Sequence, residues 1–240
     1  MEGRRAVFEL LLAGRRRVRD LWISEGLEGE LVEQIADLAD ELRVPVKRVS
    51  RTKLDAEART EAPQGVIAHA AALEEADLED LCRSKPGAPP PFLLALDGVT
   101  DPQNLGAVLR TAECAGVTGV VLPRHRAVHV TPAVAKAAAG AIEHLPIAVV
   151  AGLPAAMVRL TQLGIWTVGL DAEADRSLFG LEVGAEGVAL VLGAEGAGLS
   201  RLVRQRCDLV VAIPQRGQIG SLNVAAAGAL ACFEVARQRV

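Results

Sequence analysis

The stretch "FLLALDGVTDPQNLGAVLRTAECAG", residues 92–116, joins an apolar run to a capped helix. Residues 92–99 are almost all apolar, as in a parallel strand that is covered on both faces. Asp101 followed by Pro102 is typical of a helix N-cap with proline at the first helical position. The stretch therefore predicts a strand, a loop and a helix, which is the repeating unit of an α/β fold.

The same unit recurs toward the C-terminus. Thr131 before Pro132 marks a second helix start, and the chain ends in an Ala-rich helix from Leu222 onward, for which Ser221 is a candidate N-cap. Further apolar runs occupy residues 119–123, 147–150, 165–170, 187–193 and 209–214. These runs predict a buried parallel sheet with helices on its faces.

The composition changes at "SKPGAPPP", residues 84–91, where proline is too dense for a helix or a central strand. We place a linker there, between a domain of residues 1–83 and a domain of residues 92–240. The first domain reads as a small α/β sandwich. Its expected helices are 4–13, 29–43, 52–59 and 74–83, and its expected strands are 20–24, 44–49 and 65–70.

The bulk composition indicates a soluble globular protein. The chain has 240 residues, of which 50% are apolar and 23% charged, and no apolar stretch reaches the length of a membrane span. "RRAVFELLLAGRRR" has the order of a signal peptide, but Glu9 interrupts it, so an amphipathic first helix is the better interpretation. The four cysteines form no CxxC pair, which favours the cytoplasm, and His125 and His129 have no acidic companion, so no metal is expected.

Charge is unevenly distributed along the chain. The net charge of −4 argues against a protein that coats nucleic acid indiscriminately, but it does not exclude specific RNA binding. Six arginines precede an acidic helix at residues 28–41; they are Arg4, Arg5, Arg15, Arg16, Arg17 and Arg19. We favour a solvated helix end for this cluster, and the alternative is a patch that faces phosphate.

Three loops follow strands of the second domain, at the sheet edge where ligands of parallel sheets gather. The first, at 96–116, carries Asn104 and Arg110, and the second, "LVLGAEGAGLS" at 190–200, places three glycines around Glu195. The third is "IPQRGQIGSLNV" at 213–224. Taken singly, each polar residue has a structural interpretation: a local backbone partner, a surface charge or, for Asn223, a buried amide. Their convergence indicates a binding site.

Common nucleotide motifs do not explain these loops. "GAEGAG" is GxxGxG and not the dinucleotide fingerprint GxGxxG, and no GxxxxGK[ST] sequence is present. No Ser/His/Asp constellation is apparent either. Because the chain has no tyrosine, two tryptophans and four phenylalanines, contacts from arginine to phosphate should outweigh base stacking if the ligand is RNA.

Together the three loops resemble the three motifs of the SpoU/TrmH class of RNA ribose 2′-O-methyltransferases, within the SPOUT superfamily. Residues 1–83 are more loosely similar, through "GRRAVFELLLAG" and "QGVIA" (64–68), to the small L30e-like substrate-binding domain of members that methylate a guanosine in large-subunit rRNA. The resemblance implies S-adenosylmethionine as cofactor, a C-terminal trefoil knot and a homodimer with active sites next to the subunit interface.

The resemblance also implies roles for individual residues. Arg110 matches the arginine proposed to act at the 2′-OH; because a guanidinium stays protonated, we hypothesise that it works against the substrate phosphate. The other residues implied for the catalytic pocket are Asn104, Glu195, Ser221 and Asn223. Those implied for cofactor binding are Leu192, Gly193, Gly196, Ile213, Gln215 and Leu222.

Three positions depart from the family pattern. Gln215 stands where the family has Met, Ala225 where it has Ser, and Pro63 where members with this front domain often have His. These departures leave the RNA target open between rRNA and tRNA. A non-catalytic RNA-binding assembly factor is the alternative from another functional class.

Overall fold

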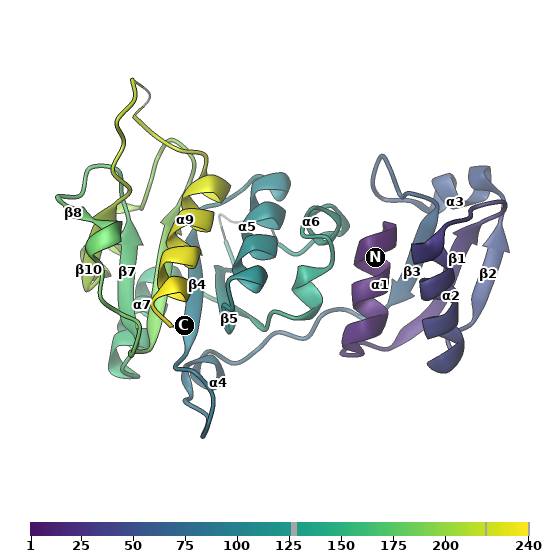
Figure 1. Ribbon diagram of the computed structural model, residues 1–240, viewed down its shortest axis with the longest axis horizontal. Helices are drawn as coiled ribbons and strands as arrows, with labels where there is room; N and C mark the ends of the chain where they lie inside the picture. Colours follow the sequence, from purple (N-terminus) through teal and green to yellow (C-terminus); the bar gives the residue numbers. More distant parts are fainter. Residues whose placement is uncertain (126–128, 219, 240) are drawn as a thin grey trace. The chain divides into compact units, whose positions relative to one another are not determined.

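The computed structural model describes residues 1–125, 129–218 and 220–239 (Figure 1). Contacts group the chain into two compact units. Unit 1 is Met1–Glu74 with Val130–His144, and unit 2 is Glu75–His129 with Leu145–Val240. The division at residues 84–91 that the sequence suggests stays a prediction.

Unit 1 is built on a three-stranded sheet in the order β2-β1-β3. The central strand β1 (Val18–Ser24) pairs parallel with β2 (Val46–Val49) and antiparallel with β3 (Val66–Ala70). The expected α/β arrangement of this part is confirmed, with α1 (Arg4–Ala13), α2 (Glu30–Glu41) and α3 (Arg51–Glu57). Helix α1 ends where the sequence predicts because Gly14 adopts the left-handed conformation, with φ of 61°.

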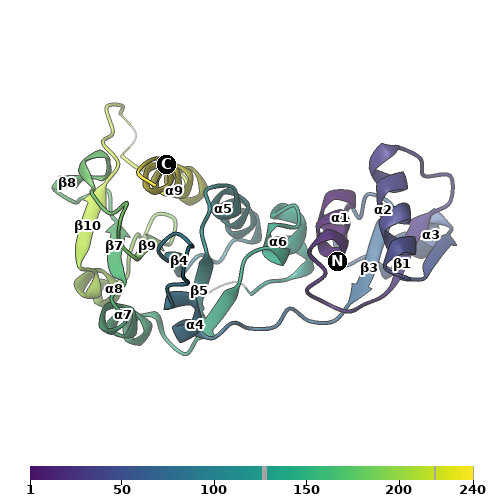
Figure 2. The ribbon, with the colours of Figure 1, turned by 60° about the horizontal axis from the view of Figure 1, so that its bottom comes forward.

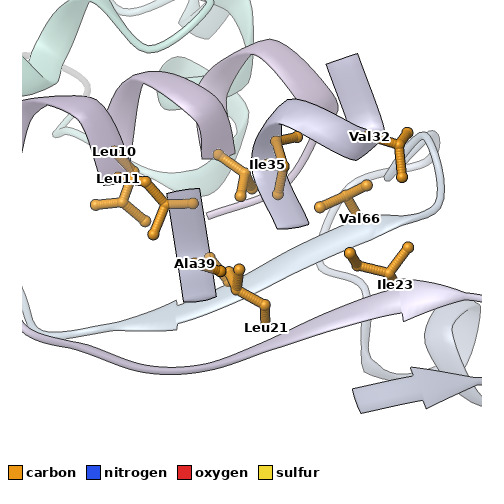
Figure 3. Close-up of a cluster of buried hydrophobic side chains, with 10 residues drawn as sticks. Leu10, Leu11, Leu21, Ile23, Val32, Ile35, Ala39 and Val66 are labelled. Atoms are coloured by element: carbon orange, nitrogen blue, oxygen red, sulfur yellow. The ribbon is translucent and has the colours of Figure 1, made fainter. Parts of the chain in front are cut away.

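The core of unit 1 lies between its sheet and the pair α1 and α2 (Figure 3). Apolar residues recur at helical spacing on both helices and alternate along β1, so one face of each element is buried. The buried side chains include Leu10, Leu11, Val32, Ile35 and Ala39 from the helices, and Leu21, Ile23 and Val66 from the sheet.

Residues 130–144 join unit 1 through an ion pair. This segment contains α6 (Pro132–Ala137), which Thr131 caps as the sequence predicts, and the 3₁₀ turn η1 (Ala141–Glu143). The Glu143 side chain is fully buried and accepts hydrogen bonds from Arg16, with 3.0 Å between Arg16 Nε and Glu143 Oε2. A buried carboxylate requires such a partner, since an unpaired buried charge is costly.

Unit 2 contains a seven-stranded sheet in the order β6-β5-β4-β9-β7-β10-β8, and every strand pairing in it is parallel. This confirms the predicted parallel sheet. The strands are β4 (Phe92–Asp97), β5 (Gly119–Pro123), β6 (Ile147–Val150), β7 (Trp166–Leu170), β8 (Arg176–Ser177), β9 (Val188–Gly193) and β10 (Leu209–Ala212).

Helices cover both faces of this sheet (Figure 2). Helices α5 (Pro102–Cys114) and α9 (Val224–Arg237) lie side by side on one face, and Gly228 lets α9 approach closely, because a Cβ there would meet Leu192 Cδ1 at 2.9 Å. Helices α7 (Leu153–Gln162) and α8 (Arg201–Arg206) pack on the other face. The remaining elements are α4 (Leu78–Cys82) and η2 (Leu178–Gly180).

Three elements differ from the sequence-based expectation. Helix α4 is shorter than 74–83 because Asp77 caps it, accepting from the backbone N–H groups of Glu79 and Asp80. The N-cap of α9 is Asn223 and not Ser221: its side chain accepts from Ala225 N, and Asn223 is exposed rather than buried. Strand β8 has only two residues, too few for an apolar pattern to indicate.

The parallel topology brings the loops after β4, β7, β9 and β10 to one edge of the sheet, where the strands end. Within the described ranges, no helix is both long enough and apolar enough to span a membrane.

Candidate active site

A cavity of about 700 Å³ lies at this edge of the sheet in unit 2. Its wall is formed by the residues that follow β7, the glycine-rich turn after β9, and the segment between β10 and α9. All six residues that the family resemblance implies for cofactor binding line it: Leu192, Gly193, Gly196, Ile213, Gln215 and Leu222. The volume suits a small-molecule ligand, since such sites typically measure about 300–1,000 Å³.

The glycine-rich turn after β9 is held closed by its own backbone. Ala194 and Gly198 exchange two hydrogen bonds, of 3.0 and 2.9 Å. Gly193 is required for this closure, because a Cβ at that position would lie 2.1 Å from the carbonyl carbon of Gly198. The turn is also tied to the end of β4, where Asp97 Oδ2 accepts from Ser200 N at 2.7 Å. The sheet therefore fixes the position of the turn.

Backbone forms much of the cavity wall. A Cβ built at Gly196, Gly198 or Gly220 would meet no atom within 4 Å, so these glycines leave open space beside the main chain. Gly196 and Gly198 have φ of +77° and +66°, which glycine adopts without strain. Apolar side chains such as Leu192 and Ile213 complete the wall. Exposed peptide groups beside apolar side chains suit a ligand with a flat apolar body and polar edges, as a nucleoside has.

Three of the implied catalytic residues form one hydrogen-bonded chain. Asn223 Oδ1 accepts from Ala225 N, so its Nδ2 is the atom that donates to Asn104 Oδ1, at 2.9 Å. Asn104 Nδ2 in turn donates to Glu195 Oε2, also at 2.9 Å. The capping of α9 thus sets the orientation of the side-chain amides of Asn223 and Asn104. The series of hydrogen bonds ends at the carboxylate of Glu195, which lines the cavity.

The structure places the other two implied catalytic residues differently. Ser221 is exposed and lines the cavity next to Leu222. Arg110 is exposed on α5 and does not line the cavity, and the described residues include no hydrogen-bond or ion-pair partner for its guanidinium. Ile219, which belongs to the third loop, lies outside the described residues.

Sequence reasoning missed an ion pair in the cavity wall. Asp171, directly after β7, accepts from Arg204 Nε of α8 at 2.6 Å and from Glu173 N at 2.9 Å. Burial by itself would raise the pKa of Asp171, but the Glu173 backbone N–H and the Arg204 guanidinium lower it below its ordinary value. The available signal was the position of Asp171 at the carboxyl end of an apolar run.

The described part of the chain contains no group of three His, Cys, Asp or Glu side chains that could hold a metal ion.

Two protein families together match almost the whole chain. The SpoU rRNA Methylase family matches residues 91–233. A second family, described as RNA 2′-O ribose methyltransferase substrate binding, matches residues 1–76.

Individual relatives and solved structures agree with these matches. A 23S rRNA (guanosine-2′-O-)-methyltransferase RlmB of Pseudomonas aeruginosa is 41% identical, over 99% of this chain and 95% of its own length. A putative TrmH family tRNA/rRNA methyltransferase of Bacillus subtilis is 40% identical, over 99% and 94%. The crystal structure of the SpoU methyltransferase AviRb from Streptomyces viridochromogenes with the cofactor AdoMet superposes with a TM-score of 0.82 at 25% identity, covering 100% of this chain and 89% of that one.

Proposed function

Because the chain belongs to the SpoU rRNA methylase family, we propose that it transfers a methyl group from S-adenosylmethionine to the ribose 2′-OH of a guanosine in large-subunit ribosomal RNA. The main support for this proposal is that the residues implied for cofactor binding and three of those implied for catalysis lie at the same edge of the sheet. The six residues implied for cofactor binding line one cavity, and the chain of hydrogen bonds through Asn104 ends on Glu195 in its wall.

The cavity residues would hold the cofactor, which supplies an activated methyl group when it is bound. The turn around Gly193 and Gly196 offers backbone groups, and Leu192, Ile213 and Leu222 offer apolar surface. The fixed turn would keep the ligand in one orientation, and fixed orientation is the main requirement of a methyl transfer between two bound groups.

Glu195 is suited to accept a hydrogen bond from the ribose 2′-OH. Its Oε2 already accepts from Asn104, so the side chain is held in one direction. A carboxylate oxygen at the edge of the cavity can orient the hydroxyl group and receive its proton as the oxygen reacts. Asn104 and Asn223 are positioning residues in this scheme, because they act through Glu195.

Arg110 would act on the substrate phosphate. A guanidinium group donates hydrogen bonds and accepts none, so Arg110 is unsuited to removing the 2′-OH proton. A fixed positive charge next to the ribose would instead orient the backbone and stabilise negative charge on the attacking oxygen. Because Arg110 is exposed on α5 and outside the cavity lining, its side chain is accessible to RNA and to a second subunit.

We propose a homodimer for this reason. The exposed face of α9 carries an apolar stripe, in which Leu230 and Phe233, three residues apart on the helix, are 43% and 50% exposed. Contiguous exposed apolar side chains of this kind mark interaction surfaces. A partner subunit on this stripe would lie beside α5, which packs next to α9 (Figure 2).

Sedimentation equilibrium tests the dimer. Phe233→Arg should give monomers, whereas the control Leu202→Arg, which changes a 54% exposed residue on α8 at the opposite face of the sheet, should leave the dimer intact. A wild-type protein that stays monomeric at micromolar concentration would contradict the proposal.

The finer features of the fold remain part of this proposal. The family resemblance supports a trefoil knot in unit 2 and an L30e-like RNA-binding domain at residues 1–83, and the match of residues 1–76 to a substrate-binding family supports the RNA-binding role. An enzyme that acts on ribosomal RNA would work in the cytoplasm, which is the location we propose.

Mapping of 2′-O-methyl groups on total RNA, with and without the protein, tests the function. The expected result is one protein-dependent guanosine in large-subunit rRNA. A protein-dependent site in tRNA would contradict the proposed rRNA substrate but agree with the proposed 2′-O-methyl transfer. Isothermal titration that shows no heat with S-adenosylmethionine, together with no methyl transfer to any RNA, would favour the non-catalytic assembly factor instead.

A further inference from the structure

The six N-terminal arginines of the sequence do not behave as one cluster. Arg5 pairs with Glu9 at 2.8 Å, and Arg4 donates to the backbone oxygen of Gln64 at 3.2 Å. Arg15 and Arg16 both bind Glu143, the first through its backbone oxygen and the second through its carboxylate. Four of the six are therefore engaged within unit 1.

The remaining two, Arg17 and Arg19, line a separate cavity of about 560 Å³ in unit 1, together with Arg59. All three arginines are exposed, and no described carboxylate pairs with any of their guanidinium groups. Three unpaired positive charges at one concave surface repel one another, so they are stabilised by an anion that joins them.

The backbone that carries these arginines is held in place. Arg17 O accepts from Ala71 N at 2.9 Å, and the pairing of β1 with β3 shifts register between Val18 and Asp20, which is a bulge at Arg19. Bulges re-aim side chains and are common beside functional sites. The Glu2 carboxylate accepts from the backbone N–H of Arg59 at 2.6 Å, which fixes the backbone of the third arginine.

The carboxylates around the cavity are already engaged. Glu2 accepts from Arg59 N and from Thr60 N, and Glu57 Oε1 lies 3.1 Å from His69 Nε2. The other ring nitrogen of His69 contacts Asp20, at 2.5 Å. None of these contacts involves a guanidinium group, so Arg17, Arg19 and Arg59 stay available to an external anion.

We propose that this cavity of unit 1, which we call the arginine cleft (Arg17, Arg19 and Arg59), binds the phosphate backbone of the RNA substrate whose ribose is methylated at the cavity of unit 2. Guanidinium groups form two parallel hydrogen bonds to phosphate oxygens, and phosphate contacts position RNA without reading its sequence. The inference rests on the proposed function, and the match of residues 1–76 to a substrate-binding family supports it.

The test measures binding of an unmethylated large-subunit rRNA transcript as a function of salt concentration. Each phosphate contact contributes about 0.7–0.9 to the slope of log K against log salt. Loss of one contact therefore weakens binding about 5- to 8-fold at roughly 0.1 M salt. The triple variant Arg17→Ala, Arg19→Ala, Arg59→Ala should lose about 100- to 500-fold in affinity and reduce the slope by about 2 to 3.

A matched control removes the same number of charges elsewhere in unit 1. Arg5→Ala, Arg43→Ala, Arg48→Ala changes three exposed arginines that do not line the cleft, and it should change affinity by less than about 10-fold. Replacement of the three cleft arginines by lysine keeps the charge and should retain most of the salt slope while losing affinity, because lysine cannot bind phosphate bidentately. Thermal unfolding verifies that each variant is folded.

Steady-state kinetics separate the cleft from the catalytic site. The triple alanine variant should raise KM for RNA, with kcat at saturating RNA and the affinity for S-adenosylmethionine unchanged. Wild-type affinity and salt slope in that variant, or an equal loss in the control, would overturn the proposal. So would tight binding of free tripolyphosphate by the cleft without any change in RNA binding. Salt-dependent RNA binding that needs the cleft, in a protein that transfers no methyl group, would refute the proposed function alone.

Discussion

Gly193→Ala should disable the cofactor cavity through a steric clash that can be followed atom by atom. The added Cβ would lie 2.1 Å from Gly198 C, 2.3 Å from Gly198 O and 2.3 Å from Leu199 N. Carbon atoms in contact normally lie about 3.5–4.0 Å apart, so the turn must move by roughly 1.4 Å or more. All of these neighbours are backbone atoms, which cannot relieve the clash by rotating a side chain.

Three effects follow from this clash. Overpacking of this kind costs about 1–3 kcal/mol of folding stability, which urea unfolding can measure. Displacement of the turn by about 1 Å should also lower kcat about 100-fold, because Glu195 moves with it. Titration calorimetry should show weakened binding of S-adenosylmethionine, since the turn lines the cavity.

Two further glycines provide graded comparisons. A Cβ at Gly217 would meet no atom within 4 Å, and this residue does not line the cavity, so Gly217→Ala should leave stability and cofactor affinity close to wild type. Gly196 also has open space but has φ of +77°, so Gly196→Ala should cost about 1–2 kcal/mol from backbone strain alone. Wild-type cofactor binding by Gly193→Ala would refute the reasoning that the closed turn shapes the cavity.

Three other properties can be predicted from the structure. Asn104→Ala and Glu195→Gln should each lower kcat about 10- to 100-fold with unchanged S-adenosylmethionine affinity, and their combination should add little further loss, because both remove one hydrogen-bonded arrangement. Burial alone would raise the pKa of Asp171, but the Glu173 N–H and the Arg204 guanidinium lower it below its ordinary value. The Asp171–Arg204 pair therefore stabilises the fold above the ordinary Asp range, near pH 4. This contribution is lost as the pH falls through the lowered pKa of Asp171. Urea unfolding of Arg204→Ala should accordingly show a deficit at pH 7 that shrinks as the pH falls below the ordinary Asp range and Asp171 is protonated, and a deficit that stays constant through that fall would contradict the assignment. Burial raises the pKa of the Cys82 thiol to about 11 and the pKa of the Cys207 and Cys232 thiols to about 12. At pH 8 a disulfide reagent should therefore label these three cysteines only after the protein unfolds.

The local elements were predictable because each depends on neighbouring residues. Asp101 and Thr131 cap their helices as expected, since an Asp or Thr before a proline reports on a few adjacent peptide groups. The buried parallel strands were predictable because covering both faces leaves an uninterrupted apolar run. The N-cap of α9 could not be predicted in this way: the sequence favoured Ser221, whereas Asn223 caps the helix, because two capping residues within one turn are locally equivalent.

The arginine cluster shows the same limit for charge. Six arginines within the first 19 residues look alike in sequence, and a solvated helix end was the favoured interpretation for all of them. The structure divides them, because Glu143 comes from a segment more than 120 positions away and engages Arg15 and Arg16. The pairing of Asp171 with Arg204, separated by 33 positions, was hidden for the same reason.

The sequence by itself determined the α/β class, the apolar strands of the parallel sheet, and the family whose motifs its glycine-bearing loops carry. It placed the three loops at one edge of the sheet, because parallel strands have their carboxyl ends there. The family resemblance implied six of the residues that line the cavity, whereas Asp171 and Arg204 were missed. Only the tertiary structure decided how these residues connect: Asn104 meets Glu195 across 91 positions and Asn223 across 119. Such contacts depend on which strands become neighbours, and that choice is made by the packing of the whole sheet rather than by any short stretch of the chain.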